Sequence, residues 1–162
     1  MLDVIVKIPA EQKAFLASVR GAMEQYFAGD QRRIQHALHV FQYAHELLAY
    51  VDADPVLTLA AAYLHDIGIP EAEHKHGSSA GKWQEVEGPP IARKLLSDLG
   101  AEVSLIERIV EIVGSHHTAG AVDSPEFHII WDADALVNFA GTFTSKDHEH
   151  IEAVLQNHMA TE

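Results

Sequence analysis

The sequence of 162 residues contains no cysteine and few basic residues. Without cysteine there is no disulfide, no thiolate metal ligand and no cysteine nucleophile, so a bound metal must use imidazole and carboxylate groups. The 11 Lys and Arg stand against 24 Asp and Glu, which gives a formal net charge of -13. This balance argues against duplex nucleic acid or an anionic membrane as a partner, because both require a basic surface.

Long hydrophobic runs are also missing. No stretch reaches the roughly 18 apolar residues of a membrane span, and residues 1–10 lack the features of a signal peptide. We therefore expect a cytoplasmic protein. Hydrophobic residues make up 48% and charged residues 22% of the chain, which excludes disorder and predicts a buried core. The length favours one domain over residues 1–162.

Apolar residues recur at intervals of three and four along most of the chain, and no segment shows the alternation typical of a strand. The expected helices cover residues 9–28, 30–51, 54–68, 89–100, 101–115, 124–140 and 145–159. Residues 69–87 are rich in Gly, Ser and charged residues and are expected to form a long loop. The helix over 54–68 is apolar on all sides, which predicts a central position. The sequence therefore predicts an all-α fold.

The 12 histidines are the unusual feature of the composition, and one of them lies beside an aspartate. His65 and Asp66 end the most apolar expected helix. An ionised aspartate there faces the negative end of the helix dipole and loses solvation, so a cation is a suitable partner. The alternative is that both side chains only cap the last carbonyl groups of the helix.

Further imidazole and carboxylate groups border the apolar faces of other expected helices. They are His36, His116, His117, Asp132 and Asp134. These groups meet only if the helices pack around a common site.

Several of these segments together resemble a known family. His36 with Val40 and Ala44, the block AAAYLHDIG, the SHH at 115–117 and the DADAL at 132–136 resemble the HD-domain superfamily of metal-dependent phosphohydrolases. The similarity spans residues 32–140. It implies a single HD-domain bundle of about six to seven helices, with an N-terminal and a C-terminal packing helix.

The resemblance also implies a set of metal ligands. The family's first His, its His-Asp pair and its last Asp correspond to His36, His65, Asp66 and Asp134. Asp132 stays an alternative to Asp134, because both flank the apolar stripe of their helix, although the family's last ligand usually lies two residues before a large apolar residue, here Leu136. His39 and His45 share the helix of His36 but do not fit the family position.

A second metal is implied for binuclear members of the family, with the signature Asp66 as the bridge. Glu87 lies where these members have a His, and His116 or His117 lies at the other position. A carboxylate at position 87 suits hard divalent ions. The alternative is that Glu87 only favours the N-terminus of the following helix.

Cations near this acidic set suggest an anionic substrate group, and phosphate is the natural candidate. Arg33 lies three residues before His36 on the same helical face, and Lys75 and Lys82 lie in the expected loop. We expect all three to bind substrate, and solvated surface charges are the alternative for each.

Together these features predict a metal-dependent phosphohydrolase that cleaves a small phosphoester, such as a nucleotide, with a metal-activated hydroxide. Asp66 is expected to accept the water proton, and His117 to protonate the leaving oxygen. One or two divalent ions are expected per chain, without a choice among Mn, Fe, Mg, Ni, Co and Zn.

Two other functions stay open, as does a homodimer. One is a di-iron oxygenase of the myo-inositol oxygenase type, and the other is a non-catalytic regulatory module that binds a ligand. The complete ligand set favours an active enzyme. Ile69 after HDIG and the missing GYP sequence disfavour a cyclic-dinucleotide phosphodiesterase.

Overall fold

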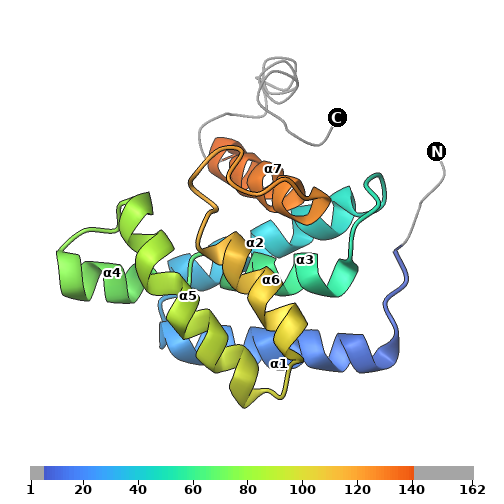
Figure 1. Cartoon of the computed structure of the whole chain (residues 1–162), viewed down its shortest axis with the longest axis horizontal. Coiled ribbons are helices and arrows are strands. Elements are labelled where there is room, and N and C mark those ends of the chain that lie inside the picture. Colours follow the sequence, from blue (N-terminus) through green and yellow to red (C-terminus); the bar gives the residue numbers. More distant parts are fainter. Residues whose placement is uncertain (1–5, 141–162) are drawn as a thin grey trace.

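The computed structural model describes residues 6–140, and over this range the chain forms seven helices and no strand (Figure 1). The helices are α1 (Ala10–Phe27), α2 (Gln31–Leu47), α3 (Pro55–Leu64), α4 (Ile69–His76), α5 (Gly81–Asp98), α6 (Val103–Val113) and α7 (Pro125–Ala140). The expected all-α fold is confirmed. The helix expected over 145–159 lies outside the described residues.

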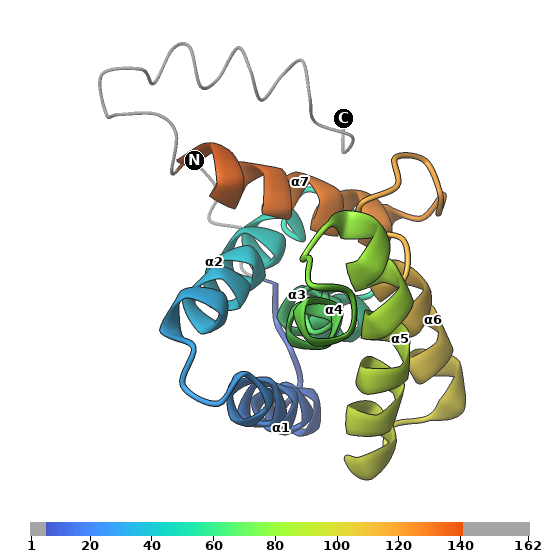
Figure 2. The same ribbon diagram turned by 90° about the vertical axis from the view of Figure 1, so that its left-hand side faces the viewer.

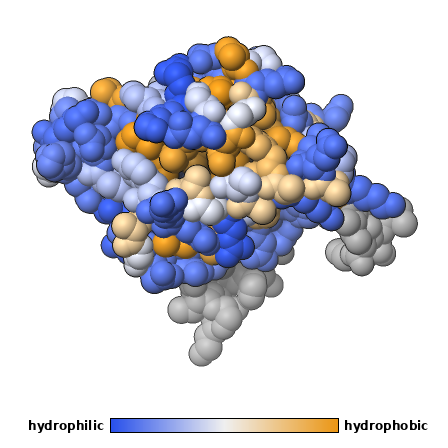
Figure 3. Space-filling model, turned by 90° about the horizontal axis from the view of Figure 1, so that it is seen from below, coloured by the Kyte–Doolittle hydropathy of each residue, from blue (hydrophilic) through white to orange (hydrophobic). Residues whose placement is uncertain are grey.

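Helix α3 is the centre of the bundle (Figure 2), and α1, α2, α6 and α7 all pack against it. Every residue from Val56 to Leu64 is buried, which agrees with its uniformly apolar sequence. Seen from below, the outer surface is mostly hydrophilic around an apolar area (Figure 3). Since α3 is enclosed, the side chains at its C-terminal end lie inside the molecule.

The starts of the three helices that carry the candidate ligands are fixed by caps. The Asp30 side chain accepts a hydrogen bond from the backbone N–H of Arg33 at the start of α2. Asp54 accepts one from Leu57 N–H at the start of α3, where Pro55 occupies the first turn. Ser124 Oγ accepts one from Phe127 N–H at the start of α7. Each cap pairs an N–H that the helix itself leaves free.

The prediction of a long loop over residues 69–87 is wrong. Helix α4 occupies residues 69–76, and α5 begins at Gly81, so that Pro89 and Pro90 lie inside a helix rather than at its start. Proline has a helical φ but lacks the N–H donor, and its ring crowds the carbonyl group four residues earlier, which loses its partner. Those carbonyls belong to Glu85 and Val86, and Val86 is 57% exposed. The side of α5 at Val86 is therefore open to water, which can pair a freed carbonyl group.

Two glycines bring the start of α4 against the middle of α5. A Cβ atom added to Gly68 would lie 2.6 Å from the backbone N of Gly88 and 2.7 Å from the carbonyl oxygen of Gln84. These are backbone atoms, so no side chain can turn away to relieve the contact. The absence of a side chain at position 68 thus sets the distance between the HDIG segment and α5.

We expect Gly68→Ala to lower the free energy of unfolding by about 1–3 kcal/mol, because overpacking forces the backbone apart. Gly21→Ala is the matched control, since a Cβ at this exposed position in α1 meets no atom within 4 Å. Alanine there should raise stability by about 0.5–1 kcal/mol. Urea unfolding of the metal-free proteins measures both changes. An unchanged midpoint for Gly68→Ala would contradict the close backbone contact.

Candidate metal centre

Helix α2 places His36 between the other candidate ligands. Its core-facing side consists of Ile34, Ala37, Val40 and Ala44, and His36 lies half-buried at the edge of this side. Helix α2 packs against both α3 and α7. The His36 Nε2 atom accordingly lies 3.0 Å from Asp134 Oδ1 on α7 and 3.3 Å from His65 Nε2 at the end of α3.

His65 is fully buried, and its ring is oriented by the helix that it ends. Its Nδ1 lies 2.8 Å from the carbonyl oxygen of Ala62. A carbonyl only accepts, so Nδ1 donates and the neutral ring carries its lone pair on Nε2. This lone pair points to the centre, where Asp66 Oδ2 lies 3.4 Å away. Metal-bound histidines in proteins show the same arrangement, with the second ring nitrogen tied to a carbonyl.

Four side chains from three segments of the chain thus converge on one point. The recorded distances among the donor atoms of His36, His65, Asp66 and Asp134 lie between 3.0 and 3.6 Å. Donor atoms that share an ion at about 2 Å have this spacing. Two imidazoles and two carboxylates also form the N/O donor set of a transition-metal site. The residues present therefore fit a divalent ion.

The charges of the centre depend on one another because the groups are buried. Burial acts to lower the pKa of His65, but Asp66 and Asp134 outweigh it and raise this pKa to about 9. Burial acts to raise the pKa of Asp66, and His65 and His116 outweigh it and lower the pKa to about 2. The pKa of Asp134 is likewise lowered against burial by its contacts to His36 and His65. Without a metal, a proton on His65 compensates part of the charge of the two carboxylates.

A second group of donors lies on the other side of Asp66. It consists of Asp66, His116 and His117. His116 Nδ1 donates to the Val113 carbonyl at 2.8 Å, which leaves the Nε2 lone pair facing Asp66 Oδ1 at 3.3 Å. This Nε2 atom is buried and has no hydrogen-bond partner. An unpartnered buried nitrogen is costly, and a metal ion would pair it.

His117 lies at the mouth of the centre and is held from α5. Its Nε2 lies 3.1 Å from Gln84 Oε1, and its backbone N–H donates to Glu85 Oε1. The Gln84 amide nitrogen donates to the Ser79 carbonyl, so the amide oxygen faces His117 and accepts from Nε2. Partial burial, and then His116, lower the pKa of His117.

Three of the predicted residues contact neighbouring side chains of α4 and α5 instead of the centre. Glu87 accepts hydrogen bonds from His76 Nε2 at 2.9 Å and Lys75 Nζ at 3.0 Å, and it belongs to neither donor group. These two contacts lower its pKa. Lys75 also pairs with Glu71, and the Lys82 ammonium lies over the Trp83 ring. All six side chains lie on α4 and the first half of α5, in the segment that was expected to form a loop without fixed side-chain directions.

Arg33 and the two aspartates of α7 take distinct positions. The Arg33 guanidinium pairs with Asp30 at 3.3 Å and with Glu73 at 2.6 Å, and it lines the same cavity as His36. Asp134 contacts His36 and His65, whereas Asp132 is fully buried.

Two polar residues beside the centre were not predicted. Asn138 Nδ2 donates to Asp134 Oδ1 at 3.3 Å, and its spacing of four residues from Asp134 on one helix is a signal that the sequence contains. Gln84 holds His117, as described above. It lies in the segment interpreted as a loop, where no helical face was available to place it.

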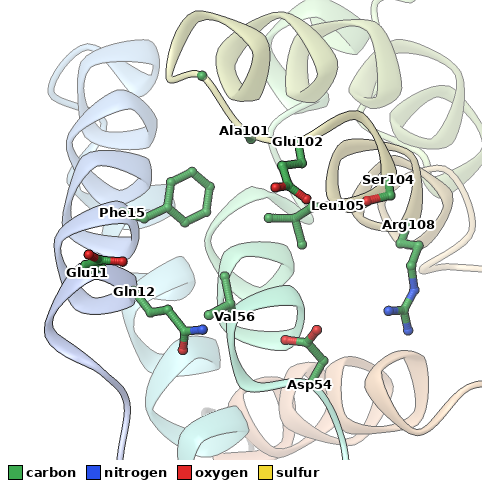
Figure 4. Close-up of a pocket in the computed structure, with 11 residues that line it drawn as sticks. Glu11, Gln12, Phe15, Asp54, Val56, Ala101, Glu102, Ser104, Leu105 and Arg108 are labelled. Atoms are coloured by element: carbon green, nitrogen blue, oxygen red, sulfur yellow. The ribbon is translucent and has the colours of Figure 1, made fainter.

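Two cavities adjoin the centre, one on each side. The first has a volume of about 400 Å³ and includes Arg32, Arg33, His36 and Asp66 in its wall. The second has a volume of about 310 Å³ and includes His116, His117, Trp131 and Asp134. A larger cavity of about 650 Å³ lies between α1 and the start of α6 (Figure 4), and none of the candidate ligands lines it.

Over residues 6–140 no helix is both long and apolar enough to cross a membrane.

Among solved structures, the chain is similar to a predicted HD superfamily hydrolase from an uncultured Thermotogales bacterium. The identity is 25%, the match covers 90% of this chain and 89% of the other, and the TM-score is 0.59.

No curated protein matches the chain. The sequence profile of the HD domain family matches residues 33–138. This range includes His36, His65, Asp66 and Asp134, the four residues that converge in the structure. The chain belongs to the HD domain family.

Proposed function

We propose that this protein is a metal-dependent phosphohydrolase that acts on a small phosphoester such as a nucleotide. The observation that carries the proposal is the convergence of His36, His65, Asp66 and Asp134 on one point beside a cavity with two arginines. The membership of the HD domain family and the similarity to a predicted HD superfamily hydrolase support hydrolysis. The arginines favour an anionic substrate group.

The four convergent residues would hold one divalent ion, and Asp66 with His116 could hold a second. A divalent ion in this position supplies Lewis acidity, which polarises phosphoryl oxygens and makes a water more acidic. The fully buried ring of His65 and its hydrogen bond to Ala62 keep the donor atoms fixed. Preorganisation of this kind avoids rearrangement during the reaction.

The arginines of the first cavity bind the phosphoryl group. Arg33 is held by Asp30 and Glu73, so its guanidinium has a fixed orientation. Arg32 makes no recorded ion pair among the described residues, lines the same cavity and can turn to the substrate. Guanidinium groups suit phosphate because they offer parallel N–H donors.

Asp66 and His117 handle the protons of the reaction. As water forms a bond to phosphorus and the bond to the leaving oxygen breaks, Asp66 accepts the proton that the water loses. His117, which lines the second cavity, gives a proton to the leaving oxygen. Proton transfers by positioned side chains typically contribute about 10²–10⁴-fold to a rate.

We expect His36→Ala to remove bound metal and to lower phosphate release by roughly 100-fold or more, since Lewis acidity contributes several kcal/mol. His39→Ala is the matched control, because His39 lies on the same helix and is exposed. Elemental analysis of protein purified without chelator, together with a phosphate-release screen over nucleotides and sugar phosphates, measures both effects. Wild-type metal content in His36→Ala would contradict the proposed centre.

A metal-loaded protein that releases phosphate from none of these esters would contradict the proposed activity while leaving the metal centre intact. It would instead favour a ligand-binding regulatory module.

The second donor group predicts different effects of His116 and Glu87. We expect His116→Ala to lower the metal content, because it removes the buried Nε2 that faces Asp66. Glu87→Gln should leave the metal content unchanged, because the Glu87 oxygens already accept from Lys75 and His76. Both variants are compared by metal stoichiometry under identical loading. Metal loss in Glu87→Gln with none in His116→Ala would overturn this assignment.

Replacement of the arginines tests the phosphoryl site. Arg32→Ala and Arg33→Ala should each lower kcat/KM by about 10- to 100-fold, mainly through KM, because each removes a charge-assisted contact worth about 1.5–3 kcal/mol. Arg93→Ala is the control, since Arg93 pairs with Glu107 on the surface between α5 and α6. Equal kinetics for all three variants would place the anionic group elsewhere.

A further inference from the structure

His116 and His117 lie in a short turn after helix α6, and this turn does not fix its own position. It covers residues 114–118, and its recorded hydrogen bonds to backbone carbonyl groups reach only the turn and the last residues of α6. The hydrogen bond from His116 Nδ1 to the Val113 carbonyl orients the ring relative to α6. The position of the turn relative to Asp66 therefore depends on contacts with another element.

Helix α5 supplies these contacts. It packs against α6 (Figure 2), and the residues on the side facing the turn, three or four positions apart, are Gly81, Gln84, Glu85 and Gly88. A Cβ atom added to Gly81 would lie 2.7 Å from His117 Cγ. One added to Gly88 would lie 2.8 Å from Val113 Cγ1. Helix α5 is thus in direct contact with the turn and with the end of α6 that precedes it.

The same helix also contacts the segment that carries Asp66. A Cβ atom added to Gly88 would lie 3.6 Å from the backbone N of Gly68, two residues after Asp66. Asp66 Oδ1 and His116 Nε2 lie 3.3 Å apart. The two segments that provide these donor atoms are therefore both placed by α5.

Glu85 makes polar contacts from α5 to the turn. Its Oε1 atom accepts hydrogen bonds from the backbone N–H of His117 and from the Thr118 hydroxyl, each at 2.9 Å. Its Oε2 atom lies 3.0 Å from the same hydroxyl. Among the described residues, the recorded hydrogen-bond partners of the Glu85 side chain all belong to the turn. Because hydrogen bonds to a carboxylate are stronger than those between neutral groups, Glu85 holds the two residues that follow His116.

We propose that Glu85 is a positioning residue for the second metal ion. By holding the turn, it keeps His116 Nε2 beside Asp66 Oδ1, so that both donor atoms are in place before an ion binds. Glu85 acts through His117 and Thr118. The inference rests on the proposed function, of which it deepens the second metal position.

The environment of His116 explains why the turn has to be held. Its Nε2 atom is buried and has no hydrogen-bond partner among the described residues, which is unfavourable. A turn free to move would carry this nitrogen toward water. The contacts of Glu85 oppose this movement. Residues that orient metal ligands in this way contribute about 10- to 100-fold to metal affinity.

The test measures Mn²⁺ binding to the metal-free protein by electron paramagnetic resonance of the free ion. The wild-type protein should bind two Mn²⁺ per chain. Glu85→Ala should lower the affinity of one site by about 10- to 100-fold and leave the other unchanged, because His36, His65 and Asp134 lie outside the turn. Glu85→Gln should retain most of the affinity, since its amide oxygen can still accept from the His117 N–H.

Glu107→Ala is the matched control. Glu107 on α6 pairs with Arg93 on α5 at 3.0 Å, so this variant removes a carboxylate contact between the same two helices but outside the turn. Both Mn²⁺ sites should keep their wild-type affinity. Equal losses at both sites in Glu85→Ala, or the same change in Glu107→Ala, would indicate a general stabilising role and overturn the inference.

Kinetics with an ester from the phosphate-release screen give a second readout. At low Mn²⁺ the kcat of Glu85→Ala should fall with the occupancy of the second site, and it should return to the wild-type value when Mn²⁺ is raised. A loss of kcat that persists at saturating Mn²⁺, with wild-type affinity at both sites, would place the effect of Glu85 on His117 alone. This result would overturn the inference.

The inference and the proposed function fail in different ways. A wild-type protein that binds one Mn²⁺ per chain, or a Glu85→Ala variant with unchanged affinity at both sites, would overturn the positioning role even if phosphate is released. Two sites with the expected dependence on Glu85, without phosphate release from any ester, would support the positioning role and overturn the proposed reaction.

Discussion

The structure depends on keeping two carboxylates and several imidazoles together at the end of a helix that has no exposed side. Asp66 and Asp134 would each lose a large solvation energy in this position if they stood alone. His36, His65 and His116 surround them at distances of 3.0 to 3.6 Å. A group of this kind is stable only as a whole, because removal of one member leaves an unpaired charge in the interior.

The arrangement of the helices follows from this requirement. Helix α3 ends inside the molecule, so its last side chains must find partners on α2, α6 and α7, the helices that pack around it. Helix α2 brings His36, α7 brings Asp134, and the segment after α6 brings His116. The Gly68 contact with Gly88 then fixes α5 beside the same end of α3. The packing of the helices therefore brings the side chains of the centre together, and the contacts among these side chains favour the same packing.

The sequence predicted those elements whose signals are local. Asp30 and Asp54 mark helix starts because a short acidic side chain reaches the free N–H groups, and both caps are present. The buried position of α3 followed from its uniformly apolar sequence. The prolines at 89 and 90 misled the prediction of α5, since their usual place in the first turn does not exclude a position inside a helix.

The centre itself has no local signal. His36 and Asp134 are far apart in sequence, and within the sequence only the resemblance to a family connects them. Glu87 shows the limit of the resemblance. It occupies a ligand position of the family in the sequence, but its side chain is turned to Lys75 and His76. The direction of a side chain depends on where its residue lies around the helix. Because this segment was expected to be a loop, no such direction could be predicted.

The hydrogen bonds of His65 to Ala62 and of His116 to Val113 have a consequence for the whole bundle. Carbonyl groups in the last turn of a helix usually turn to water. Here two of them orient imidazoles, so helix ends and ion binding are thermodynamically linked. Unwinding of either turn would misdirect a ligand, and an ion that binds the folded centre would in turn resist that unwinding. The last turns of these two helices would normally fray first. Here their order depends on the bound metal.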